Sequence, residues 1–209
     1  MSTFLRLALH LAPAAVLASA LTPTSARGDQ DDGGPWSRGH VSIGLGAGVS
    51  GSRDVTIIGA AIQGSYFVAN GVALGAEVDE TYLAWRPVIR SKYPHFADTI
   101  PSSVLRVTPT LRLVPLRSPH FSPFILAGAG PTFLNHNGGT LAHWIAMPGV
   151  MIAMGPRAFL SLGVRFTDDH PPSRCTDAFT YKTVDGTMLE IEGFCGFSWS
   201  PRIGLSFAF

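Results

Sequence analysis

The stretch WSPRIGLSFAF, residues 199–209, alternates between two kinds of side chain. One set is apolar and consists of Trp199, Pro201, Ile203, Leu205, Phe207 and Phe209. The other set is small or polar and consists of Ser200, Arg202, Gly204, Ser206 and Ala208. Because successive side chains of a strand point to opposite faces, this alternation predicts a β-strand with one apolar face and one small, polar face.

The same period of two recurs along the sequence. Seven further segments alternate in this way, at residues 41–49, 58–68, 72–79, 103–115, 122–134, 142–154 and 158–169. The two faces are least distinct in the segments 122–134 and 142–154. Few windows place apolar residues at helical spacing, so the pattern predicts an all-β fold of eight strands, each about long enough to cross an outer membrane when tilted.

Composition excludes several classes of protein. The chain has 209 residues, a formal net charge of +1 and only 14% charged residues, which is the size of one domain. A nucleic-acid-binding protein would show a basic excess or basic clusters, and neither is present. The low charge and high apolar content favour a membrane as the partner.

The first residues are typical of a secretory signal peptide. A basic Arg6 precedes an apolar stretch, Leu7–Leu21, and small residues follow at Ala20 and Ala26. The stretch is short for a membrane-spanning helix, which needs about 20 apolar residues. We expect a signal peptide over residues 1–26, cleaved after Ala20 or Ala26, rather than a transmembrane anchor.

The polar faces decide between a soluble β-sandwich and a membrane barrel. A sandwich would point many charges into water. Here the polar faces carry mainly Gly, Ala, Ser and Thr, which suits the inside of a narrow closed barrel that side chains must fill. We therefore predict an antiparallel, up-and-down transmembrane barrel over residues 40–209, with its apolar face toward lipid and a short flexible segment, residues 27–39, before it.

The connections between the predicted strands alternate in length. Those after the second, fourth and sixth strands are short, whereas those at about 86–102 and 168–186 are long. Transmembrane barrels have short periplasmic turns and longer extracellular loops. Both termini of the barrel are therefore expected on the periplasmic side, although the short connection GSRD, residues 51–54, after the first strand departs from this rule.

Several segments together resemble one family. The glycine-rich VSIGLGAGVSG (41–51), FSPFILAGAGPTF (121–133), LGVRFTDD (162–169) and RIGLSFAF (202–209), with the export signal, are similar to the small outer-membrane β-barrels of the OmpA/OmpX type. The resemblance implies that the terminal aromatic Phe209 is a signal for the barrel assembly machinery. It also implies outer-membrane lipid and lipopolysaccharide as surroundings; we expect a monomer.

Charged residues on the polar faces form the first candidate site. Six are predicted to point inward: Glu77, Asp79, Arg106, Arg112, Arg165 and Arg202. Eight strands enclose only enough space for side chains, and buried charges persist when they are paired. We favour an ion-paired plug over a polar pore, with contacts of Glu77 or Asp79 to Arg106 or Arg112 on the neighbouring strand.

Two short motifs have structural interpretations. GAGVSG, residues 46–51, matches a nucleotide-binding G-x-G-x-x-G, but no helix follows it, so the glycines are expected to relieve crowding inside the barrel. His40 and Ser42 have the His-x-Ser spacing of outer-membrane lipid A deacylases, yet they open the first strand rather than lying late in the chain. The remaining histidines lack metal-ligand spacing, and no metal or cofactor is expected.

Cys175 and Cys195 are the two cysteines of an exported chain. An even number of cysteines in such a chain favours a disulfide over free thiols. Cys175 belongs to the last long loop and Cys195 is expected near the top of the final strand, so the bond would stiffen the largest loop.

The predicted function is that of a non-enzymatic outer-membrane barrel with a structural or surface-interaction role through its loops. The segment 85–96 combines Arg86, Arg90 and Lys92 with the aromatic Trp85, Tyr93 and Phe96, a mixture suited to anionic headgroups at a membrane interface. The alternatives are a narrow small-solute channel and a lipid A-modifying enzyme.

Overall fold

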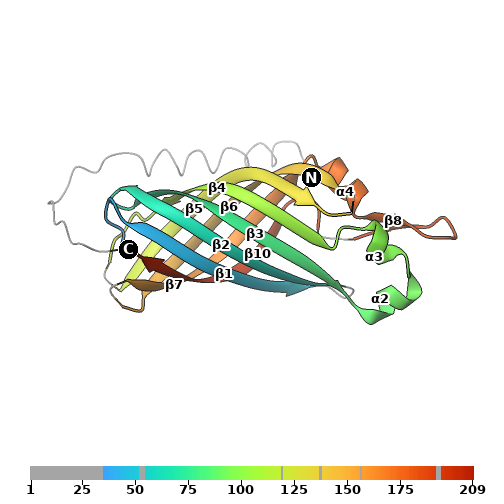
Figure 1. Cartoon of the computed structure of the whole chain (residues 1–209), viewed down its shortest axis with the longest axis horizontal. Helices are drawn as coiled ribbons and strands as arrows, with labels where there is room; N and C mark the ends of the chain where they lie inside the picture. The colour runs from blue at the N-terminus through green and yellow to red at the C-terminus, as the bar shows by residue number, and fades with distance from the viewer. Residues whose placement is uncertain (1–34, 52–54, 119, 137, 156, 192–193) are drawn as a thin grey trace, which may run out of the picture. The chain divides into compact units, whose positions relative to one another are not determined.

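The computed structural model describes residues 35–209 except 52–54, 119, 137, 156 and 192–193. The predicted signal peptide, residues 27–34 and most of the GSRD connection lie outside the described residues. Eight antiparallel strands close into one barrel, in the order β1-β10-β7-β6-β5-β4-β3-β2 (Figure 1). They are β1 (Val41–Gly51), β2 (Val55–Ala69), β3 (Val72–Trp85), β4 (Ser103–Leu113), β5 (Phe121–Leu134), β6 (Gly139–Ala153), β7 (Ala158–His170) and β10 (Ser198–Ala208). The predicted fold is confirmed.

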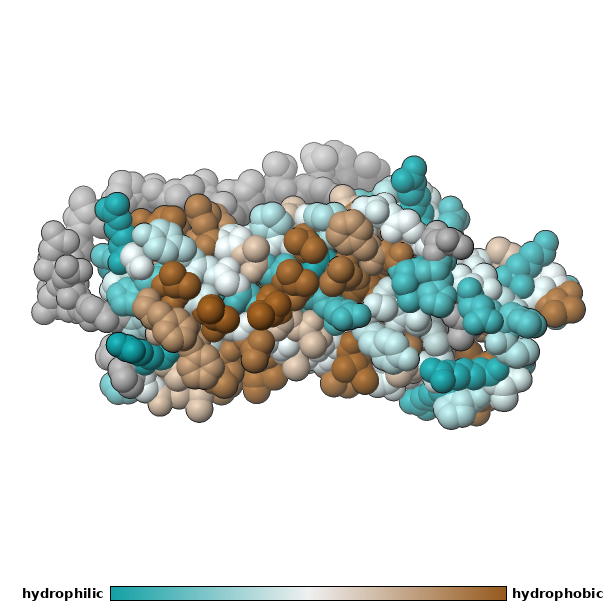
Figure 2. Space-filling view, in the orientation of Figure 1, coloured by the Kyte–Doolittle hydropathy of each residue, from teal (hydrophilic) through white to brown (hydrophobic). Residues whose placement is uncertain are grey.

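The outer wall of the barrel is apolar. Leu45 on β1 pairs with Ile62 on β2 and Leu205 on β10, and all three side chains are exposed. Apolar residues spread over the wall in Figure 2, whereas hydrophilic residues gather at the two ends. The alternation read from the sequence therefore assigns the faces correctly, because a closed sheet turns one whole face outward. Among the described residues, no helix is long and apolar enough to cross a membrane.

The two ends of the barrel differ in their connections. At the turn end, where β1 begins and β10 ends, β2 and β3 are joined by a tight turn at Asn70 and Gly71. Gly71 has φ +77°, and a Cβ there would lie 2.6 Å from the carbonyl oxygen of Val114, so glycine is needed.

The opposite end, the loop end, carries short helices that the period of two did not predict. They are α2 (Pro87–Lys92), α3 (Phe96–Thr99) and α4 (Pro172–Ala178), followed by a small hairpin of β8 (Thr180–Lys182) and β9 (Met188–Glu190) (Figure 1). The last loop begins later than predicted, because β7 continues to His170.

The interior, which we call the lumen, has three layers. At the turn end lies an apolar cluster, the turn-end plug: Trp36, Phe67, Ala73, Val114, Phe124, Leu126, Ile145, Met151, Phe159 and Ala208. At the loop end lies a second cluster, the loop-end cap: Val55, Leu83, Trp85, Phe96, Ile100, Val104, Leu134, Leu141, Cys175, Phe179, Tyr181 and Phe194. Charged side chains fill the space between them.

Trp36 belongs to the segment that was predicted to be short and flexible. Its side chain is 4% exposed and packs edge-on against Phe159, with ring centroids 4.7 Å apart. Its carbonyl oxygen accepts a hydrogen bond from the backbone N–H of Gly71 at 2.8 Å. The residues just before β1 therefore fill the turn end of the barrel, a position that the sequence did not indicate.

Candidate functional site

The middle layer of the lumen contains all six charged residues named from the sequence. Glu77 and Asp79 project from β3, Arg106 and Arg112 from β4, Arg165 from β7 and Arg202 from β10. Five of the six are buried, and Arg202 is half-buried. Each lies on the inward face of its strand because the period of two places it between outward apolar neighbours.

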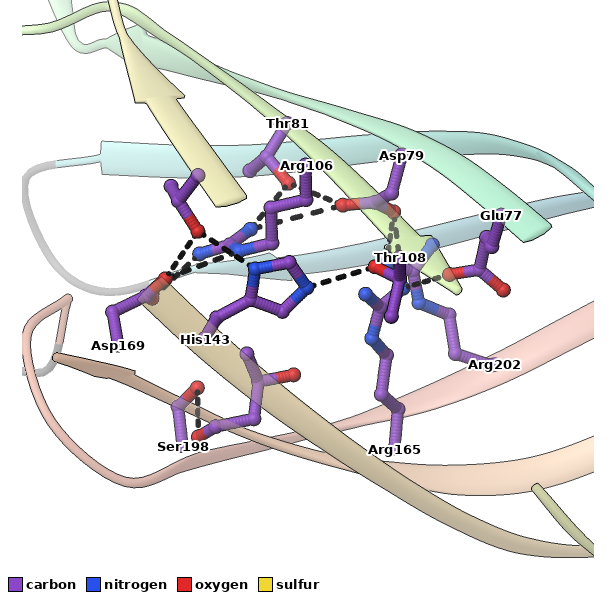
Figure 3. A network of polar contacts seen from close by, with 12 residues as sticks. Glu77, Asp79, Thr81, Arg106, Thr108, His143, Arg165, Asp169, Ser198 and Arg202 are labelled. Carbon is purple, nitrogen blue, oxygen red and sulfur yellow. Dashed lines mark hydrogen bonds and ion pairs between the residues drawn. The ribbon is translucent and has the colours of Figure 1, made fainter. Parts of the chain in front are cut away.

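Asp79 lies at the centre of this layer (Figure 3). Its side chain has no exposed surface, and its carboxylate oxygens lie 3.7 Å from Arg106 and 3.2 Å from Arg165. Arg202 donates a further hydrogen bond to the same carboxylate. A buried carboxylate is tolerated only when cations and hydrogen bonds compensate for its lost hydration, and three guanidiniums do so here.

Glu77 pairs across the lumen rather than along the sheet. Its carboxylate accepts a hydrogen bond from Arg165 at 2.6 Å, between strands β3 and β7. The sequence-based prediction considered only acids and arginines on neighbouring strands. It therefore included the contact between Asp79 and Arg106 but not the one between Glu77 and Arg165. In a barrel of eight strands the lumen is narrow enough for long side chains from opposite walls to meet.

Of the two arginines that were expected to contact Glu77 or Asp79, Arg106 pairs with Asp79 and Arg112 has other partners. Within the described part of the chain it forms no ion pair; its Nη2 donates to the side-chain oxygen of Gln63 at 2.5 Å. Its guanidinium carbon also lies 5.7 Å from the centroid of the Phe124 ring. Arg112 is thus held by an amide and an aromatic face next to the turn-end plug.

A second polar cluster adjoins the first and was not named from the sequence. Arg106 donates to both carboxylate oxygens of Asp169, at 2.8 and 3.4 Å. Thr132 donates its hydroxyl hydrogen to Asp169 at 2.8 Å, so it can only accept from Nδ1 of His143 at 3.0 Å. In the neutral imidazole, Nε2 of His143 then accepts from Thr108 at 2.8 Å, and the hydrogen is carried on Nδ1.

A signal for this second cluster was present in the sequence. Asp169 falls on the same face of β7 as Arg165, four residues later in the alternation. His143 falls on the inward face of β6, where the two faces could not be told apart because both are largely apolar.

The His-x-Ser motif does not form a reactive pair. The Ser42 hydroxyl lies inside the lumen, 2.7 Å from that of Ser65, and Ser42 is 3% exposed. Nδ1 of His40 lies 3.1 Å from the carbonyl oxygen of Ser37 instead. The GAGVSG glycines lie in strand β1, where a Cβ at Gly48 would lie 3.3 Å from Cδ of Arg202. Among the described residues, no group of three or more His, Cys, Asp or Glu could hold a metal ion.

The loop-end cap contains the predicted disulfide, and the bond is confirmed. Cys175 in α4 is joined to Cys195, with Cα atoms 5.5 Å apart. Cys195 lies before β10 rather than within a strand, since β10 begins at Ser198. Cys175 is fully buried and packs in the same cluster as Phe179 and Phe194.

The first long loop divides its residues between the surface and the cap. Arg86, Arg90 and Lys92 are exposed. Trp85 and Phe96, which were expected to contact headgroups, are buried at 5% and 4% exposure, with ring centroids 4.8 Å apart. Trp85 and Phe96 thus fill the cap, Tyr93 is half-buried with Nζ of Lys92 5.3 Å from its ring centroid, and the basic side chains lie at the surface.

Two cavities flank the ion pairs of the middle layer. One of 40 Å³ lies toward the turn-end plug and the other, of 140 Å³, lies toward the loop-end cap. Both are lined by Arg165 and Arg202.

Comparison with solved structures agrees with this architecture. The fold is that of the small eight-stranded outer-membrane β-barrels. The outer-membrane protein OprG from Pseudomonas aeruginosa is similar, with 12% sequence identity, 85% of this chain and 98% of OprG covered, and a TM-score of 0.51. Neisserial surface protein A (NspA) matches at 12% identity over 81% of this chain and 96% of NspA, with a TM-score of 0.48. No family model and no curated protein matches the sequence. At such low identity the likeness extends to the fold alone.

Proposed function

We propose that this chain is a non-enzymatic outer-membrane β-barrel whose loop end acts at the cell surface. The apolar wall of Figure 2 supports a lipid environment, because such a surface is unfavourable in water. The placement of the longer connections at one end supports an extracellular loop end and a periplasmic turn end. Phe209, exposed at the turn end, is then available to the assembly machinery before the barrel closes.

The observation that carries this proposal is the filled lumen beneath a packed loop end. Two apolar layers and a layer of ion pairs occupy the interior, and the two cavities that border the ion pairs have volumes of 40 and 140 Å³. The loops, in contrast, pack with the ends of the barrel strands in one buried cluster and carry a disulfide. A barrel built this way displays a fixed surface rather than conducting solutes.

The exposed surface of α2 is the part best suited to an anionic partner. Arg90 and Lys92 lie in its last turn, and Val88 in the same helix is 71% exposed. Cations near an anionic membrane surface contribute about 1 kcal/mol each. Lipopolysaccharide, which carries phosphates next to acyl chains, is the partner that this mixture favours.

Binding of purified barrel in nonionic detergent to immobilised lipopolysaccharide tests the proposal. Replacing two cations, Arg90→Gln with Lys92→Gln, should weaken binding by about 10- to 30-fold, since about 2 kcal/mol is removed. A matched variant, Arg117→Gln with Arg157→Gln, removes two exposed cations from the turn end and should bind like the wild type. Equal losses in both variants would show only a nonspecific response to net charge.

Two further measurements separate the other functions. Planar-bilayer recordings should remain at background, and sustained conductance steps would favour a channel. Ser42→Ala should leave the lipid A mass spectrum of expressing cells unchanged, because the Ser42 hydroxyl faces Ser65 inside the lumen. Cross-linking in detergent should give a monomer.

A further inference from the structure

The junction between the first and last strands is paired over only part of its length. β1 and β10 are in register from Ser42 opposite Ala208 to Ala47 opposite Ile203, where the pairing stops. Both strands nevertheless continue, since β1 pairs with β2 as far as Gly51 and β10 pairs with β7 from Ser198. Above the Ala47–Ile203 pair, these two strands therefore face each other without a hydrogen-bonded ladder.

A proline explains where the pairing stops. Val41 and Phe209 exchange two backbone hydrogen bonds, at 3.1 and 2.9 Å. Hydrogen-bonded pairs occur at every second residue of an antiparallel ladder. From Val41 and Phe209 they therefore continue to Ala47 opposite Ile203, and the next hydrogen-bonded pair would be Val49 opposite Pro201. Proline has no N–H to donate, and it is found in sheets where the N–H would face no partner.

Inside the barrel, the larger cavity reaches this unpaired junction. It has a volume of 140 Å³, and its lining includes Gly48, Ser198 and Ser200 from the two unpaired edges. The guanidiniums of Arg106, Arg165 and Arg202 line it together with hydroxyl side chains, and no carboxylate lies among its described lining residues. The carboxylates that pair with these guanidiniums, those of Glu77, Asp79 and Asp169, do not line this cavity.

Some of those guanidinium nitrogens have no hydrogen-bond partner in the described part of the chain. They are Nη2 of Arg165 and both Nε and Nη1 of Arg202. Each of these nitrogens has less than 1 Å² of accessible surface, so they lie beside the cavity rather than open to it, out of reach of water. Buried donors of this kind favour an acceptor, and a guanidinium binds phosphate or carboxylate oxygens most strongly.

Outside the barrel, an apolar groove lies over the same junction. Its volume is 350 Å³, and its lining includes outward residues of three strands: Ala47, Val49, Leu162, Pro201 and Ile203. Gly48, Val49 and Arg202 line both the groove and the cavity. A Cβ at Gly48 would lie 3.3 Å from both Cδ of Arg202 and the carbonyl oxygen of Pro201. A larger residue at this position would therefore crowd the two strands where the groove and the cavity share lining residues.

We propose that this junction binds an anionic acyl lipid, with its phosphate or carboxylate head on Arg202 and Arg165 and its acyl chain in the outer groove. The guanidinium-lined cavity matches the head, the apolar groove matches the chain, and the unpaired stretch above the Ala47–Ile203 pair, whose residues line both spaces, is where one molecule would reach from one to the other. The inference rests on the membrane placement proposed above, which supplies such lipids to the wall. It is a site in the barrel wall, separate from the surface of α2.

Native mass spectrometry of the folded barrel released from nonionic detergent tests the site, with dodecyl phosphate as the probe. The wild type should retain one molecule, and neither inorganic phosphate nor dodecyl maltoside in equal concentration should displace it. Arg202→Gln removes the head contact and should reduce retention at least tenfold. Pro201→Val restores the missing N–H, allows the ladder to extend to Val49 and should reduce retention to a similar extent.

Matched variants and a folding assay make the result decisive. Pro123→Val changes a proline of β5 away from the junction, Arg157→Gln removes an exposed cation at the turn end, and both should retain dodecyl phosphate like the wild type. Retention unchanged in Arg202→Gln and Pro201→Val overturns the proposal, as does displacement by inorganic phosphate alone. Insertion into vesicles and heat-modifiable gel mobility, measured in parallel, report on membrane placement independently of binding.

Discussion

The turn-end plug and the loop-end cap are both apolar clusters that close the lumen, but their residues come from different structural elements. In the plug, Phe67, Phe124 and Phe159 project inward from regular strands, and Trp36 is the main contribution from outside them. In the cap, Phe96, Ile100, Phe179 and Phe194 come from connections between strands. The turn end is therefore packed almost wholly by barrel strands, whereas the loop end is packed by barrel strands and loops together.

This difference has a physical consequence for how each end is held. Side chains on a strand are oriented by the ladder hydrogen bonds, so the plug forms whenever the barrel closes. Loop residues must first lose backbone freedom, which costs about 1–2 kcal/mol per residue, before their contacts stabilise anything. The disulfide between Cys175 and Cys195 reduces that cost at the loop end, and the described part of the turn end has no counterpart.

The largest expected effect separates the two ends by truncating one aromatic in each. Phe159→Ala should lower the free energy of unfolding of the whole barrel by about 3–5 kcal/mol, because a buried aromatic side chain of a barrel strand is lost from the turn-end plug. Phe179→Ala should lower it much less and should instead expose the loops to protease. Urea unfolding in lipid vesicles and limited proteolysis measure the two quantities, and equal losses of unfolding free energy would contradict the distinction.

Removal of the disulfide tests the loop end alone. The bond closes a loop with a sequence separation of 20 residues, which corresponds to a nominal stabilisation of about 3 kcal/mol. The variant Cys175→Ser with Cys195→Ser should become protease-sensitive between α4 and β10 while the unfolding midpoint of the barrel stays near that of the wild type. A midpoint that falls in step with loop protection would mean that cap and barrel unfold as one unit.

The wall between the two ends supplies the third prediction. Leu205 lies within the paired part of β10, whereas Phe209 lies at its very end. Arginine costs about 2–4 kcal/mol at the midplane of a bilayer and about 0–1 near its interfaces. Leu205→Arg should therefore destabilise the refolded barrel in vesicles more than Phe209→Arg does.

Surface abundance in cells should give the opposite order for the same two variants. If Phe209 is an assembly signal, its loss impairs insertion even where the folded barrel tolerates the change. Labelling of the loop end on intact cells measures this. Equal effects of both substitutions in both assays would mean that this strand neither faces lipid nor ends in an assembly signal.

The smallest effect concerns the charged layer that separates plug from cap. Glu77→Gln and Arg165→Gln should couple by about 0.5–3 kcal/mol in a double-mutant cycle of unfolding free energies, because the two side chains share a hydrogen bond of 2.6 Å. Glu77→Gln combined with Arg157→Gln, an exposed and distant cation, should be additive within about 0.5 kcal/mol. Additivity in both cycles would show that the layer fills space without specific pairing.

The sequence predicted those parts of the fold that follow from period two. All eight barrel strands and the inward direction of Glu77, Asp79 and the four arginines follow from alternation, since a strand leaves a side chain only two directions. The helices of the loop end were not predicted, because helices of four to seven residues are too short to show a helical period. The position of Trp36 depends on contacts with residues distant in the sequence, which no local pattern contains.

The candidate site was predictable as a set of residues but not as a set of contacts. Asp79 and Arg106 were paired correctly because they are direct neighbours across the β3–β4 ladder. The partner of Glu77 lies on the far wall, and its choice depends on the diameter of the lumen and the length of Arg165. Asp169 was missed because it lies where the predicted strand 158–169 overlaps the predicted long loop, and His143 was missed because the faces of β6 could not be told apart.

The contact between Glu77 and Arg165 also affects the shape of the barrel in cross-section. In the order of strands around the wall, β3 and β7 stand four places apart, which makes them diametrically opposite. Ladder hydrogen bonds fix the circumference of such a ring, but a ring of fixed circumference can still flatten into an ellipse. Ion pairs from Arg165 to Glu77 and Asp79 connect the two opposite walls at fixed distances of 2.6 and 3.2 Å, so they hold the section round under lateral pressure from the surrounding bilayer.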